Sequence, residues 1–446
     1  MTILNESGIP NVTSPLRGLA GLAERLPDAL FIVAGTRADA HLAQALSSPL
    51  PGTPSDPSYN GFGMHPRIMF AVLEPDEEPD SGALASNVLT AIGSEHPGLV
   101  LLVACRSLGL LGVDANFEAT LVERRLDLPV RAMVFDPGDL GVLSTDFEDG
   151  AIQTLIGLCP EDVLEEERSH SKVRLFDKLP FRNRPGRQTA PLSSTPSGRR
   201  SAVVLLGALP GPQRELADEL ERVGVEVAGA VPDAEWLPTI GEETIVAIAD
   251  PYLVRSCREA EERGAMGVRT LMPIGVEGTA RFVQDVAASA GRGTREASHQ
   301  VRQVWEGLEP LRNRIRGKRI FFTGDTGLEV PLARFLANAG AVVLEVGTPR
   351  LDKRFLAAEL SALGEDVDVV ESPEWRAQLE RIDAARPDLV VASPGLYAPL
   401  VARGHLCRSS LDLLSLGIHG YQGARRVLEL FARTFERAER LDTLNL

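Results

Sequence analysis

The chain has 446 residues, of which 44% are hydrophobic, 24% charged and 5% aromatic. With 46 Lys and Arg against 62 Asp and Glu, its formal net charge is −16. This charge argues against a general nucleic-acid binder, which needs a basic face to neutralise phosphates. It is compatible with docking to a basic partner. No apolar run approaches the ~20 residues of a membrane span, and the N-terminus has no secretion-signal pattern. We therefore expect a cytoplasmic protein of several domains.

Seven short apolar runs recur along the chain, each followed by a Gly-containing turn and a helical pattern. They are Leu30–Gly35, Leu99–Cys105, Ser201–Ala208, Thr244–Asp250, Arg319–Asp325, Ala341–Pro349 and Asp388–Gly395. Continuous apolar runs are typical of strands buried on both faces of a parallel sheet. The pattern predicts an α/β fold built from doubly wound parallel-sheet units.

Two changes in composition predict the domain boundaries. Residues 168–200 hold nine Lys or Arg and one Asp, with a Ser/Thr-rich end. This composition indicates a solvated linker or loop, or alternatively a basic docking strip. A second boundary lies near Gly317. We predict units at 1–165, 200–316 and 317–446, with residues 166–199 as the basic linker or loop.

Several familiar catalytic motifs are absent from the sequence. There is no GxxxxGK[ST] phosphate loop for ATP, and no GxGxxG follows a strand to bind a dinucleotide. There is also no GxSxG elbow of a hydrolase. The seven histidines do not cluster at metal-ligand spacing, and the four cysteines form no CxxC pair. The residues alone predict no self-contained active site, although three such units could enclose a ligand between them.

The order of several local motifs is more specific. The segments that carry it are Arg17–Gln44, His65–Glu77, Leu205–Gly211, Asp250–Ala265, Pro273–Thr279, Lys318–Pro349, Glu380–Val391 and Gly417–Thr434. In order and spacing, this series resembles the N-subunit family of light-independent protochlorophyllide reductases, in the nitrogenase-like superfamily. The resemblance covers nearly the whole chain, and Pro160–Gly198 matches poorly.

This resemblance implies a fold of three Rossmann-like domains and a heterotetramer with a homologous B-type subunit. It also implies a [4Fe-4S] cluster between the two subunits and an apolar pocket for protochlorophyllide or a related tetrapyrrole. A separate ATP-binding iron–sulfur L protein would deliver the electrons that reduce ring D to give chlorophyllide a. The chain would then be a subunit of an oxidoreductase, and ATP would bind to another subunit.

The family pattern has three cluster-ligating cysteines in N, since thiolates are the usual iron–sulfur ligands. Here Arg17 stands before the GLTG-like turn, and Cys105 is the sole candidate ligand. Arg106 takes that place if the match slips by one residue. A cysteine at the end of a strand is also a common small core residue. We expect the cluster to be absent or bound mainly by the partner.

Other positions match the family in part. Glu148 and Asp149 match its Glu–Asp pair, and His419 and Tyr421 match near the C-terminus, whereas Ser409 replaces an aromatic residue. His419 is a candidate for proton relay, or alternatively a hydrogen-bonded surface or interface histidine. These differences leave a second hypothesis open, namely a cluster-less, non-catalytic paralogue that acts in assembly, pigment delivery or regulation.

The last helical segment offers a possible contact surface. Val427, Leu428, Phe431 and Phe435 share one face of the predicted helix. This face could bind the partner subunit or pack within the chain, and the sequence leaves both interpretations open.

Overall fold

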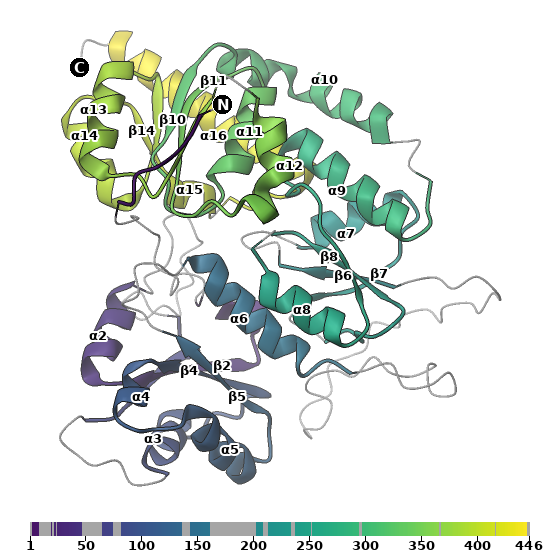
Figure 1. Ribbon diagram of the computed structural model, residues 1–446, viewed down its shortest axis with the longest axis vertical. Coiled ribbons are helices and arrows are strands. Elements are labelled where there is room, and N and C mark those ends of the chain that lie inside the picture. The colour runs from purple at the N-terminus through teal and green to yellow at the C-terminus, as the bar shows by residue number, and fades with distance from the viewer. Residues whose placement is uncertain are drawn as a thin grey trace.

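The computed structural model describes residues 2–8, 19, 22–23, 25–46, 65–74, 82–135, 143–160, 202–207, 213–232, 237–250, 252–293, 297–364, 367–414 and 416–443. These residues form three parallel sheets with helices packed against them (Figure 1). The predicted α/β class with Rossmann-like units is confirmed, and each of the seven apolar runs contains a strand. The basic segment 166–199 lies outside the described residues. Within the described part, no helix is both long and apolar enough to cross a membrane.

The first unit contains a four-stranded sheet with the order β3-β2-β4-β5. Its strands are β3 (Ile68–Val72), β2 (Ala29–Gly35), β4 (Leu99–Cys105) and β5 (Val130–Phe135). Its helices are α2 (Arg37–Leu46), α3 (Ala83–Ile92), α4 (Ser107–Leu110), α5 (Ala115–Leu126) and α6 (Ser144–Ile156). Every residue of β2 and β4 is buried, as expected for central strands covered on both faces.

The second unit repeats this arrangement with the order β7-β6-β8-β9. Its strands are β7 (Val227–Val231), β6 (Ala202–Leu206), β8 (Thr244–Ile248) and β9 (Met266–Val268). Helices α7 (Gln213–Arg222), α8 (Val254–Glu262), α9 (Gly275–Ser289) and α10 (Ala297–Ile315) follow these strands. One hydrophobic cluster, which includes Phe147 on α6, Leu206 on β6 and Leu253 before α8, joins the first two units. They therefore share a core.

The third unit contains a six-stranded sheet with the order β1-β12-β11-β10-β13-β14. Its strands are β1 (Thr2–Asn5), β12 (Asp368–Glu371), β11 (Val342–Thr348), β10 (Arg319–Phe322), β13 (Leu389–Ala392) and β14 (Cys407–Ser409). Its helices are α11 (Glu329–Asn338), α12 (Lys353–Leu363), α13 (Trp375–Ala385), α14 (Pro394–Ala402), α15 (Ser410–Leu414) and α16 (Gly420–Thr443). Without β1, the strands follow the doubly wound order, which reverses direction between β10 and β13.

The N-terminal strand lies outside the unit in which we expected it. Residues 2–5 fall within the predicted first unit, yet β1 pairs in parallel with β12, from Thr2 opposite Asp368 to Asn5 opposite Glu371. Figure 1 shows this purple strand beside the third sheet, away from the other purple and blue elements. The expected placement of residues 2–5 in the first unit was wrong, because pairing between strands more than 360 residues apart leaves no local signal in the sequence. The other boundaries stay a prediction.

The C-terminal helix α16 packs within the chain. Val427, Leu428 and Phe431 are fully buried and Phe435 is 4% exposed, and all four belong to the core of the third unit. Of the two interpretations of this apolar face, the structure shows intramolecular packing.

The loop between β10 and α11 turns around the buried carboxylate of Glu329. This carboxylate accepts hydrogen bonds from the backbone N–H groups of Asp325, Thr326 and Gly327, at 2.6 to 2.9 Å. The Thr326 hydroxyl donates a fourth hydrogen bond at 2.8 Å. The first residue of α11 thereby fixes the loop at the carboxyl end of β10.

Candidate functional site at the junction of the three units

The carboxyl ends of β8, β10 and β11 approach one another beside helix α6. Ligands of doubly wound sheets bind outside these ends of the strands. Figure 1 shows α6 between the first and second sheets, with one end near the third. Leu143, at the start of α6, lies 3.4 Å from where a Cβ on Gly327 would stand, and the ring of Tyr252 lies 3.7 Å from the same point. All three units therefore meet here.

Helix α6 brings acidic side chains to the junction. Asp149 is buried and accepts hydrogen bonds from the backbone N–H groups of Arg255 and Ser256, at 2.9 and 2.8 Å. The Ser256 hydroxyl adds a hydrogen bond at 2.7 Å. Asp149 thus satisfies the free N–H groups at the start of α8 and holds the first two units together. Its neighbour Glu148 is also buried.

Arg350 follows β11 and contacts the other two units. Its guanidinium donates to both carboxylate oxygens of Asp146 on α6, at 2.9 and 3.1 Å. It also lies over the ring of Tyr252 from the second unit, 4.7 Å from the ring centroid. The Tyr252 hydroxyl donates to the backbone carbonyl of Arg350 at 3.0 Å. One cation therefore links all three units.

Asp250 stands directly after β8 and is 4% exposed. Burial raises the pKa of its carboxyl group to about 6, and the charge of Asp149 adds to the rise. The Tyr252 N–H, which donates to Asp250 at 2.8 Å, and the charge of Arg350 act in the opposite direction. A buried carboxyl group that exchanges its proton near neutral pH is a candidate for a functional role.

Cys105 lies elsewhere, at the end of β4 in the first unit. It is 2% exposed and belongs to the hydrophobic cluster that the first two units share. A Cβ on Gly35 would stand 3.0 Å from the Cys105 Cβ. Nearby, Asp39 accepts hydrogen bonds from the Thr36 hydroxyl at 2.6 Å and the Ser107 hydroxyl at 2.5 Å. The surroundings of Cys105 thus combine an apolar core with a small, internally bonded polar cluster.

The described residues do not fit an iron–sulfur cluster held by this chain. Over the described ranges, no three His, Cys, Asp or Glu side chains come together as a metal site. Burial raises the pKa of the Cys159 thiol to about 12 and that of Cys407 to about 11, and it also raises the pKa of Cys257. These three thiols are therefore protonated near neutral pH, which does not suit cluster ligands. The role of Cys105 as a ligand stays a prediction.

His419 is buried, with 3% of its surface exposed, so it does not lie on the surface of this chain. Its role, as a proton relay or as an interface histidine, stays a prediction. Its backbone forms an antiparallel bridge with Ile274, and the adjacent Gly420 N–H donates to the Pro273 carbonyl at 2.8 Å. These contacts join the start of α16 to the start of α9. Cys105 and His419 thus belong to different units, and the structure does not bring them together.

Ser409 ends β14 at the carboxyl edge of the third sheet. Its hydroxyl accepts a hydrogen bond from the Leu411 N–H at 3.3 Å. The next residue, Ser410, donates to the buried carboxylate of Asp325 at 2.7 Å. The aromatic residue expected at this position is therefore replaced by small hydroxyl groups that hold the loops of the third unit.

Sequence reasoning missed Asp250, Tyr252 and Arg350 as members of one site. A signal was present, because Asp250 directly follows a buried apolar run and Arg350 follows another. Polar residues directly after parallel strands lie at the ligand-binding edge of such sheets. The sequence did not show that the carboxyl ends of these two strands, which belong to different sheets, lie next to each other; only the structure shows this.

Comparisons with known proteins give a consistent result. Residues 172–436 match the family described as nitrogenase component 1 type oxidoreductase. The light-independent protochlorophyllide reductase subunit N of Roseiflexus castenholzii is 31% identical, over 99% of this chain and 96% of that protein. The Heliobacterium modesticaldum subunit N is also 31% identical, over 97% and 95%. Among solved structures, nitrogenase Cp1 at pH 6.5 has a TM-score of 0.66 at 14% identity, covering 97% of this chain and 94% of its own.

Proposed function

This chain belongs to the nitrogenase component 1 type oxidoreductase family, and we propose that it is the N-type subunit of a light-independent protochlorophyllide reductase. The observation that carries the proposal is the 31% identity to N subunits over almost the whole length of both chains. In this role the complex would reduce ring D of protochlorophyllide to give chlorophyllide a. This reduction would require a B-type subunit and an ATP-binding L-type protein.

The junction of the three units supplies chemistry that fits this proposal. Reduction of a carbon–carbon double bond adds two electrons and two protons. The electrons would come from the partner proteins, while protons need a donor that is still partly protonated near neutral pH. The carboxyl group of Asp250, whose pKa is raised to about 6, has this property. Tyr252 and Arg350 would hold the walls of the junction around it.

The cluster that the family implies would transfer electrons when bound. If the complex holds such a cluster, Cys105 is the candidate ligand from this chain, and the partner would provide the other ligands. ATP would bind to the L-type protein. The alternative of a cluster-less paralogue in assembly, pigment delivery or regulation differs from the main proposal in one testable respect, since such a complex would not convert the pigment.

A surface on the first unit suits the homologous partner. Leu110 on α4 is 88% exposed, and Phe117 on α5 is 49% exposed. Both lie close in sequence to Cys105, beyond the carboxyl end of β4. Since the apolar face of α16 is buried within the chain, we assign the contact with the B-type subunit to this region of the first unit.

The direct test is co-expression of the full chain with its B-type partner. The purified complex is mixed with the L-type protein, ATP, a reductant and protochlorophyllide, and pigment conversion is followed by absorbance. We expect conversion that needs all components, and no ATP turnover by this chain alone. A stable complex that never converts the pigment would support the non-catalytic paralogue. A chain that stays monomeric beside its partner would contradict both readings.

A further inference from the structure

A cluster of arginine side chains borders the junction of the three units. Arg269 directly follows β9, and Arg350 and Arg354 follow β11, so all three stand beyond the carboxyl ends of parallel strands. Ligands of doubly wound sheets bind at this edge. We call these three residues the arginine rim. They concentrate positive charge in a chain whose net charge is −16.

Two aromatic rings connect the members of the arginine rim. The guanidinium carbons of Arg269 and Arg354 lie 5.3 and 5.4 Å from the ring centroid of Phe355. The Phe355 ring packs edge-on against Tyr252, with centroids 6.5 Å apart, and Arg350 lies over Tyr252. Tyr252 is buried in the core of the third unit. The rim is therefore held on a fixed apolar support.

The three arginines differ in their counter-charges. Arg354 donates to both carboxylate oxygens of Asp352, at 3.0 and 2.5 Å. Arg350 pairs with Asp146. Arg269 is exposed, and it has no carboxylate within ion-pair distance in the part of the chain that the structure describes. It is therefore the member of the rim that can bind an external anion.

Helix α8 fixes the position of Arg269 from a second side. Burial raises the pKa of the Cys257 thiol, and a hydrogen bond from Arg269 acts in the opposite direction. The thiol itself donates to the Glu261 carboxylate at 3.2 Å. Arg269 thus contacts both Cys257 and the Phe355 ring, which orients its guanidinium without neutralising it.

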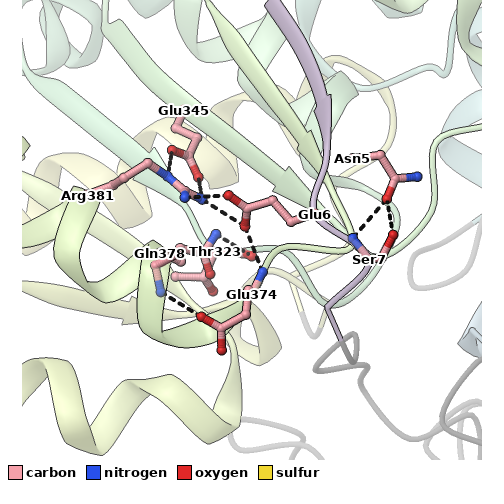
Figure 2. Close-up of polar contacts among 9 residues, drawn as sticks. Asn5, Glu6, Ser7, Thr323, Glu345, Glu374, Gln378 and Arg381 are labelled. Carbon is pink, nitrogen blue, oxygen red and sulfur yellow. Dashed lines mark hydrogen bonds and ion pairs between the residues drawn. The ribbon is translucent and has the colours of Figure 1, made fainter.

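Arg381 on α13 shows the contrasting arrangement of a neutralised arginine (Figure 2). Its guanidinium donates to Glu6 at 2.6 Å and to both carboxylate oxygens of Glu345, at 2.6 and 3.0 Å. Figure 2 shows the guanidinium between these two carboxylates. Two acids therefore satisfy Arg381, whereas the described residues supply none for Arg269.

Arg269 stands next to Asp250 along the edge of the second sheet. Strands β8 and β9 pair in parallel, with Ala247 opposite Val268, so Asp250 and Arg269 follow neighbouring strands. Such strands lie about 4.8 Å apart. A ligand of the size of a tetrapyrrole can therefore contact both side chains.

We propose that Arg269 binds the carboxylate of the tetrapyrrole at the junction, an inference that rests on the proposed function. Arginine binds a carboxylate through two N–H groups at once, which gives direction as well as strength. Protochlorophyllide carries a free propionate carboxylate on ring D, the ring that is reduced. Binding of this carboxylate to Arg269 brings ring D toward Asp250, the proposed proton donor. Arg269 thereby selects the free acid and orients its reactive ring.

Pigment binding tests this site without turnover. The full chain is purified with its B-type partner, and the binding of protochlorophyllide and of its propionate methyl ester is followed by pigment fluorescence. We expect the parent complex to bind the acid roughly tenfold more tightly than the ester, the scale of a hydrogen bond to a charged group. Arg269→Gln should remove this difference by weakening the binding of the acid alone. The preference should also fall as salt is raised, because ions screen an exposed charge.

Arg354→Gln is the matched control. It removes a guanidinium from the same ring, but Asp352 already balances that charge, so we expect less than about a twofold change for either pigment. A parent complex that binds acid and ester equally, or an Arg269→Gln complex that keeps the preference, would overturn the carboxylate site and leave the proposed function intact. A parent complex that binds neither pigment would overturn the proposed function, and this inference with it.

Discussion

Arg334 and Glu359 form an ion pair in the interior of the third unit. The Arg334 Nε lies 2.6 Å from the Glu359 Oε2, and their side chains are 0% and 2% exposed. The other Glu359 oxygen accepts from the Met272 N–H at 2.7 Å, and Arg334 donates to the Ile274 carbonyl at 3.0 Å. The pair thus fixes the chain as it passes from the second unit into the third.

Breaking this pair should destabilise the protein strongly. We expect Glu359→Ala to lower the free energy of unfolding by about 3–5 kcal/mol, because it leaves a buried guanidinium without its counter-charge. Arg281→Ala, which removes an exposed ion pair with Asp285, should cost less than about 1 kcal/mol. Denaturant unfolding of both variants measures the difference. Similar losses in the two would show that the buried pair does not organise this region.

Replacing both partners by apolar residues should cost less than removing one. In the double variant Arg334→Met/Glu359→Leu, no buried charge is left unpaired, so we expect it to be more stable than Glu359→Ala. The same unfolding experiment measures it. A double variant less stable than the single one would mean that the hydrogen bonds to residues 272 and 274 outweigh the charges.

Asp250 should make stability depend on pH. Its pKa is about 6 in the folded chain and 3.8 ordinarily. The protonated carboxyl group therefore contributes its full share to the stability of the fold below pH ~4, and this contribution is lost as the pH rises through 6. A difference of about two units corresponds to roughly 3 kcal/mol. Asp250→Asn cannot ionise, and we expect it to gain stability relative to the parent chain between pH 4 and 7. Unfolding curves at several pH values measure this gain.

Asp352→Asn is the control for that experiment. The pKa of Asp352 is lowered, mainly by its hydrogen bond with Arg354, which is the opposite direction from Asp250. Asp352→Asn should therefore not become more stable relative to the parent chain as the pH rises. Parallel pH curves for Asp250→Asn and the parent chain would contradict the raised pKa.

Asp149 should matter more than an ordinary helix cap. We expect Asp149→Ala to lower the free energy of unfolding by about 2–3 kcal/mol, because it leaves the N–H groups of Arg255 and Ser256 at the start of α8 without their carboxylate acceptor. The Ser256 hydroxyl keeps its hydrogen bond to the backbone carbonyl of residue 149. Asp114→Ala removes the exposed cap of α5 and should cost about 1 kcal/mol. If both losses are equal, the contact between α6 and α8 rests on apolar packing alone.

Cys105→Ala separates the two interpretations of that thiol. As a core residue it should cost roughly 1 kcal/mol and leave the complex with the B-type partner intact. As a cluster ligand it should abolish the iron content of the purified complex. Iron analysis of parent and variant complexes decides between them, and Cys407→Ala, a buried cysteine in another unit, is the control.

The sequence predicted the central strands well, since each is a continuous apolar run buried on both faces. It did not predict β1 or β12, because TILN and DVVE are short and partly polar, and β1 pairs with β12 only from the edge of the sheet. The resemblance singled out Asp149 but not its position at the start of α8, 106 residues away. The junction likewise depends on Arg350 reaching Asp146, which lies 204 residues earlier, and local patterns do not encode such contacts.

The carboxylate of Glu329 has a consequence for nucleotide chemistry. In dinucleotide-binding proteins, the turn after the first strand of such a sheet offers its backbone N–H groups to a phosphate. Here the equivalent turn after β10 gives those groups to the protein's own side chain. The third unit thus carries a built-in substitute for a phosphate anion. A nucleotide would have to displace Glu329 to bind there, so the unit keeps the shape of a cofactor-binding fold while its phosphate position is already filled.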